Sequence, residues 1–91
     1  MELERIRIFL AAAEAGSFSE AARRLYISHS TTSRAVSALE DEIGVTLIDR
    51  EDNRITGLTA AGRLLYEKGG ELLRMEEGLR RECAALGAKE K

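Results

Sequence analysis

The chain has 91 residues, of which 44% are hydrophobic and 33% are charged. This composition is typical of one globular domain rather than of a disordered or fibrous chain. A domain of this size buries only roughly 60–65% of its unfolded surface, so pairing with a second subunit would add useful burial.

His29 and Cys83 are the only histidine and cysteine. The sequence therefore excludes an intrachain disulfide and a zinc site closed by Cys and His ligands, and we expect no metal and no cofactor. No apolar run approaches the ~20 residues of a membrane span, and the first five residues lack the basic and apolar regions of a signal peptide. We expect a cytoplasmic protein without a membrane partner.

The formal net charge is −2, which by itself argues against a nucleic-acid partner because Lys and Arg drive phosphate binding. The charge is unevenly distributed, however. Only the segment 17–39 is clearly positive, since Arg23, Arg24 and Arg34 stand against the single acid Glu20. An anion-binding face is expected there, whereas the acidic run 40–42 is expected to be a solvated helix end that faces away from phosphate.

Two helices are predicted in the first 25 residues. Apolar residues at helical spacing predict a helix over about 3–15, ending at Gly16. Ser17 and Glu20 have the spacing of a capping box, in which the Ser17 oxygen accepts a free backbone N–H and Glu20 reaches back to the Ser17 amide. This box begins a second, short helix that ends near Leu25.

Ser28 is expected to cap a third helix, which ends at Gly44. Val36, Leu39 and Ile43 form its apolar face, with Thr32 at the edge of the core. The opposite face is small, polar or cationic. Two helices joined by a tight turn, the second exposing hydrogen-bonding side chains, are typical of a helix-turn-helix. The residues of that face are His29, Ser30, Ser33, Arg34 and Ser37.

The next segment predicts a β-hairpin. Residues 45–48 favour a strand, 49–53 resemble a turn, and 55–58 form a second short run. Arg50 and Arg54 stand at or beside its tip, so the hairpin is a candidate wing that reaches a DNA backbone or minor groove. For Arg50 a surface ion pair with Asp49 or Asp52 is an equal alternative.

Thr59 is expected to cap a last helix over about 60–86, which is longer than the core of one small domain requires. Leucines recur in it every seven residues, the period of a helix seam against another helix. The positions three residues away from these leucines are poorly suited to a seam. Gly69-Gly70 also costs about 1–2 kcal/mol of helix propensity, so a full leucine zipper is not expected. The candidate dimerisation residues are Leu65, Leu72, Met75, Leu79 and Leu86.

The run from Phe9 to Leu25 resembles the opening of LysR-type bacterial transcriptional regulators. The later runs 27–28, 33–34, 38–40, 43–50 and 58–62 fall in that family's order, so the resemblance covers about residues 1–66. It implies a mainly α fold: a winged helix-turn-helix over 1–59, with a three-helix core and a short hairpin wing, and a linker helix over 60–91 that pairs subunits. It also implies a homodimer or higher homo-oligomer that binds near-palindromic promoter DNA.

Three features depart from the family pattern. His29-Ser30-Thr31-Thr32 stand where the family commonly has Gln-Pro-Ala and an aliphatic residue, so a different base preference is expected. The stretch from Arg50 to Leu58 is about one residue longer than usual, and Gly57 is assigned as the extra residue. Family members also continue into an effector-sensing domain, so this segment is expected to bind no small-molecule effector; it is either an excised domain or a naturally short member.

The expected DNA-binding residues come from three parts of the chain. Helix 28–43 is expected in the major groove, where Arg34 makes a bidentate contact to guanine or binds a phosphate, and the wing 49–58 near the backbone or minor groove. The start of the second helix is either only a cap or also a phosphate anchor. The full set is Ser17, Phe18, Ser19, Ser28, His29, Ser30, Thr31, Ser33, Arg34, Ser37, Arg50 and Arg54.

Two other functions are weighed against DNA recognition. The first is an interaction module that pairs through its long helix with full-length regulators and modulates their assembly, while binding DNA weakly. The second is an enzyme, which the inventory of residues disfavours: one histidine, one cysteine, no phosphate loop and no recognisable pair of nucleophile and base.

Overall fold

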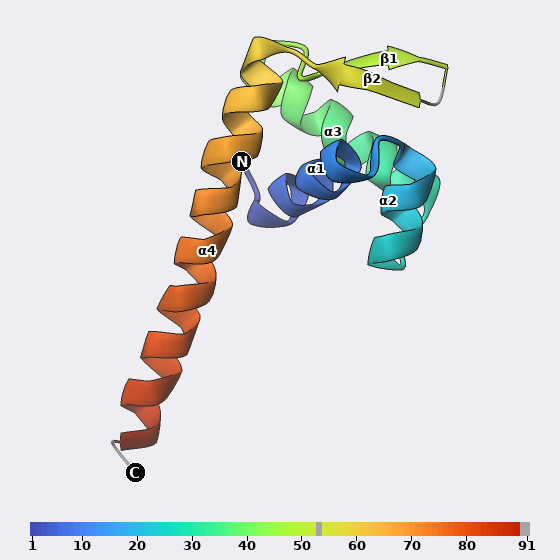
Figure 1. Ribbon diagram of the computed structural model, residues 1–91. Coiled ribbons are helices and arrows are strands. Elements are labelled where there is room, and N and C mark those ends of the chain that lie inside the picture. Colours follow the sequence, from blue (N-terminus) through green and yellow to red (C-terminus); the bar gives the residue numbers. More distant parts are fainter. Residues whose placement is uncertain (53, 90–91) are drawn as a thin grey trace.

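The computed structural model describes residues 1–52 and 54–89, which form four helices and one hairpin. The first three helices gather beside the upper half of α4, the hairpin projects from the same end, and the rest of α4 extends away from the other elements (Figure 1). None of these helices is both long and apolar enough to cross a membrane. The mainly α fold with a hairpin wing and a long last helix is confirmed. The elements are α1 Leu3–Ala15, α2 Phe18–Leu25, α3 His29–Ile43, β1 Ile48–Glu51, β2 Arg54–Leu58 and α4 Ala60–Lys89.

The helices begin where the sequence predicts. Ser17 accepts a hydrogen bond from the Glu20 amide at 3.1 Å, Ser28 accepts from the Thr31 amide at 3.0 Å, and Thr59 accepts from the Gly62 amide at 3.0 Å. The second half of the predicted capping box is different. The Glu20 carboxylate pairs with two arginines one turn along α2 instead of reaching back to Ser17, because charged partners lie on its own helix face.

One apolar core lies where α1, α2, α3, the start of the hairpin and α4 meet. Thr32, expected at the core edge, is completely buried, and its hydroxyl donates to the Ser28 carbonyl at 3.1 Å. Ile43, predicted on the core face, is 43% exposed because it lies in the last turn of α3, at the rim of the core. The buried cluster is Ile6, Phe9, Ala12, Phe18, Ala21, Val36, Leu39, Leu47, Ile48 and Leu65.

Two glycines bring α4 against this core. A Cβ atom at Gly62 would overlap the Leu47 carbonyl oxygen, and one at Gly69 would lie 2.8 Å from the Ile6 Cγ2 atom. From the sequence, Gly69 was expected only to lower the helix propensity of its segment. Gly69 also allows close packing, because a side chain at this position would push α4 away from α1.

The hairpin is confirmed, but its strands are shifted. β1 starts at Ile48 and includes residues 49–51, which were expected in the turn, whereas 45–47 form no strand. Glu51 pairs with Arg54 and Arg50 with Ile55, but Asp49 pairs with Gly57. The unpaired residue in this bulge is therefore Thr56.

Glu40, which was expected in a solvated acidic run, contacts the entry to the hairpin. Its side chain is only 16% exposed, and its carboxylate accepts hydrogen bonds from the Leu47 amide at 2.8 Å and the Ile48 amide at 3.4 Å. The same carboxylate pairs with the Arg50 Nη2 atom at 2.8 Å, so the ion-pair partner of Arg50 is neither Asp49 nor Asp52. Glu40 thus joins α3 to the first residues of the hairpin.

Replacing Glu40 tests this joint. Glu40→Ala is expected to lower the free energy of unfolding by about 1–3 kcal/mol, because two backbone N–H groups and one guanidinium lose their acceptor. Glu40→Gln keeps a side-chain acceptor and should cost less. Urea titration followed by circular dichroism measures both variants. The exposed neighbour Asp41, changed to Asn, is the control, with an expected effect within about 0.5 kcal/mol; an equal effect of Glu40→Ala and Asp41→Asn would contradict the joint.

Candidate nucleic-acid interface

The first turn of α3 carries a cluster of hydroxyl groups. Ser28, His29, Ser30 and Thr31 are all exposed. The Ser28 hydroxyl donates to Thr31 Oγ1 at 2.7 Å and lies 3.3 Å from Ser30 Oγ, while it also caps the helix. Ser28 is therefore occupied within the protein, whereas His29, Ser30 and Thr31 present their remaining hydrogen-bonding groups to solvent.

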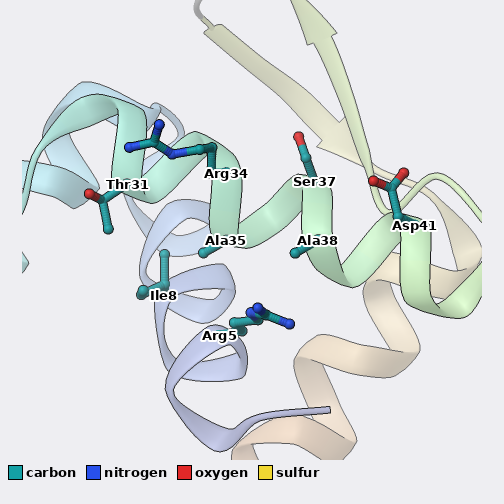
Figure 2. A pocket seen from close by; sticks show the side chains of 8 residues that line it. All are labelled: Arg5, Ile8, Thr31, Arg34, Ala35, Ser37, Ala38 and Asp41. Carbon is teal, nitrogen blue, oxygen red and sulfur yellow. The ribbon is translucent and has the colours of Figure 1, made fainter.

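Farther along α3, Arg34 and Ser37 line an open hollow between α1 and α3, with a volume of about 640 Å³. Figure 2 shows Thr31, Arg34 and Ser37 extending from α3, while Arg5 approaches from α1. Among the described residues, Arg34 belongs to no ion pair, so its guanidinium is available to a ligand. Arg5, whose guanidinium lies 3.9 Å from the Glu2 carboxylate, was not among the expected residues, because its segment carries no net positive charge and no motif. Ser33, also on α3, is partly buried.

The side chain of Phe18 is not exposed to a ligand, so only its backbone N–H group can serve the predicted phosphate anchor. Its side chain belongs to the core and is 4% exposed. The ring stands edge-on to His29, with a centroid separation of 6.0 Å, and the Arg50 guanidinium carbon lies 5.0 Å from its centroid. Phe18 and Arg50 therefore support α3 from behind, because an apolar first residue of α2 packs inward and draws the cation over its ring.

The wing is tied to the start of α2. The Ile55 amide donates to the Gly16 carbonyl at 3.2 Å, and an isolated antiparallel bridge joins Ser17 to Arg54. Arg54 and Ser19 are exposed beside this bridge. The start of α2 is thus joined to Arg54 by this bridge and to the start of α3 by the Phe18–His29 contact, and these parts together are named the candidate DNA surface. Its residues are Ser17, Ser19, His29, Ser30, Thr31, Ser33, Arg34, Ser37 and Arg54.

Two of the three arginines in segment 17–39 are engaged with an acid of the same helix. Glu20 pairs with both Arg23 and Arg24, and the Arg23 hydrogen bond lowers the pKa of the Glu20 carboxyl and raises the pKa of Arg23. Arg34 is thus the arginine of segment 17–39 that remains unpaired within the described residues. Across the same residues, no group of three or more His, Cys, Asp or Glu side chains could hold a metal ion.

The long helix exposes a separate apolar surface. Leu65, expected there, instead packs in the core at 9% exposure and does not belong to the exposed face. Leu64 is 59% exposed and was missed, because the seven-residue leucine pattern selects its neighbour. At 3.6 residues per turn the exposed residues span about 80° of the helix. This α4 apolar face consists of Leu64, Leu72, Met75, Leu79 and Leu86.

Known proteins share both the sequence and the fold. The model of the lysR family of bacterial regulatory helix-turn-helix proteins matches residues 3–63. The HTH-type transcriptional regulator ClcR of Pseudomonas putida is 43% identical over 77 residues, which cover 85% of this chain and 26% of ClcR. TcbR of Pseudomonas sp. strain P51 is 38% identical over 89 residues, covering 96% of this chain and 30% of TcbR. The chain spans less than a third of either relative.

Solved structures agree with this match. A crystal structure of the CbnR DBD in complex with DNA has a TM-score of 0.82 at 38% identity, covering 93% of this chain and 99% of that chain. The BenM DBD in complex with benA site 1 DNA has a TM-score of 0.87 at 30% identity, covering 94% and 99%. With the family model matching residues 3–63 and with these relatives, the chain belongs to the LysR family of bacterial regulatory helix-turn-helix proteins.

Proposed function

We propose that this chain is a sequence-specific DNA-binding domain of a LysR-type transcriptional regulator that acts in the cytoplasm and is not an enzyme. The observation that carries the proposal is the candidate DNA surface, on which the polar face of α3, the start of α2 and Arg54 lie together. The BenM and CbnR domains of similar fold were crystallised with DNA. That likeness supports the same ligand for this chain.

The parts of the surface have different tasks in this proposal. An α-helix fits the major groove of B-DNA, so α3 brings His29, Ser30 and Arg34 to the base edges. The free backbone N–H groups at the start of α2 bind a phosphate, with Ser17 and Ser19 beside them. Arg54 binds the backbone or minor groove next to that phosphate. Phosphate contacts thus fix the register, and α3 reads the sequence.

Pairing through the α4 apolar face completes the proposal. The face is unpartnered in a single chain, and a two-fold pair would bury it while presenting two copies of α3. Two such helices bind half-sites related by the same symmetry, which explains a near-palindromic site. The interaction-module alternative uses the same α4 face but gives no role to the exposed polar residues of α3, so it is less supported.

Two arginine variants test the assignment of roles. From randomised duplexes we expect selection of a half-palindromic site that binds about 10³-fold or more tighter than a scrambled duplex. Arg34→Ala should then cost about 1–3 kcal/mol on the selected site and relax base preference. Arg54→Ala should weaken both duplexes similarly and reduce the salt slope by about 1.

Fluorescence anisotropy at two salt concentrations measures these affinities. Equal losses from both variants on both duplexes would contradict the division of roles. Failure of the wild-type chain to enrich any sequence would contradict the proposed function itself.

A second test addresses assembly. Changing Leu72 and Leu79 to Ala removes apolar area at the centre of the α4 apolar face, so sedimentation should shift from dimer to monomer at a given concentration. Binding to a two-half-site duplex should weaken, whereas binding to one half-site should not change. Glu77→Ala, on the opposite side of α4, is the control and should leave assembly unchanged. A dimer that persists in the double variant would contradict this role of α4.

A further inference from the structure

The two faces of the wing differ: the inward face packs against the core, and the outward face carries exposed charged residues. Side chains alternate along a strand, and in β1 Ile48 is buried while Arg50 lies over Phe18, so both face the core. Asp49 and Glu51 therefore lie on the outer face. In β2 the bulge at Thr56 keeps the inward face apolar, since both Ile55 and Leu58 pack against the core.

Glu51 is the cross-strand partner of Arg54. Residues opposite each other in an antiparallel pair share a face, with Cβ atoms about 5 Å apart. Both side chains, with that of Asp52, line one hollow of about 520 Å³ at the end of the wing. Whatever Arg54 approaches, the Glu51 carboxylate therefore approaches as well.

The charges on this outer face do not favour DNA. Three exposed carboxylates, Asp49, Glu51 and Asp52, accompany the one arginine Arg54. Arg50, the other arginine of the hairpin, is held inward by Glu40 at 2.8 Å. A carboxylate near a phosphate, or near the negative potential of a minor groove, is repelled. The carboxylates of the wing therefore oppose the attraction of Arg54 for DNA.

We propose that Glu51 offsets the attraction of Arg54 for DNA phosphates, and so limits the sequence-independent affinity of this domain. The inference rests on the proposed DNA-binding function and deepens it. With the wing contribution held low, affinity depends mainly on the contacts that α3 makes with base edges. Glu51 is thus a residue that sets specificity through charge rather than through contact with a base.

Glu51→Gln tests the proposal, because it removes the charge and keeps the shape of an exposed side chain. The dissociation constant for a scrambled duplex should fall about two- to fivefold, the range expected for one exposed charge pair. The slope of log affinity against log salt should steepen by up to about 0.9, as one more phosphate is neutralised. Thermal unfolding should be unchanged, which separates the effect from folding.

Glu77→Gln is the matched control, since it makes the same change in net charge at an exposed position of α4. Its affinity for the scrambled duplex should match that of wild type. Equal gains in the two variants would overturn the proposal, because net charge alone would then explain them. No gain in Glu51→Gln, with Arg54→Ala still weakening binding, would overturn the role of Glu51 while DNA binding stands. Failure of the wild-type chain to bind DNA would overturn the proposed function instead.

Discussion

The structure depends on one carboxylate. Glu40 stands in the second half of α3, and its oxygens bind two backbone amides at the entry to the hairpin and the guanidinium of Arg50. Arg50 in turn covers Phe18, and Phe18 meets the ring of His29 at the start of α3. This chain of contacts fixes α3, the start of α2 and the wing relative to one another. The candidate DNA surface is therefore formed before a ligand arrives, which reduces the ordering cost of binding.

The same core also sets where α4 leaves the domain. Gly62 and Gly69 allow the helix backbone to lie against Leu47 and Ile6, so α4 is seated before it extends beyond the other elements. A Tyr66 hydroxyl that donates to Glu14 at 3.1 Å adds a polar contact between α4 and α1. The orientation of the DNA-reading surface is thus coupled to the helix through which we propose that subunits pair. Spacing between two half-sites would follow from this geometry.

Local signals in the sequence predicted the helix starts well. Ser17, Ser28 and Thr59 cap helices because their hydroxyls satisfy amides only three residues away. The predictions were wrong where a contact between residues far apart in the sequence determines the local structure. The Leu47 and Ile48 amides donate to Glu40, seven and eight residues earlier, and Phe18 and Leu65 pack in the core. For the candidate DNA surface, the exposed face of α3 followed from helical periodicity, whereas the inward turn of Arg50 depends on its pair with Glu40, ten residues earlier.

The most direct measurement is a two-dimensional amide NMR titration of the labelled chain with its selected duplex. The account predicts that residues 17–19, 29–37 and 54 shift together at one stoichiometry, because Glu40 and its partners hold them as one surface. The amide chemical shifts of the part of α4 that extends beyond the core should depend on dimer formation and not on DNA concentration. Shifts confined to α3, with the start of α2 and Arg54 unchanged, would contradict a single preformed surface.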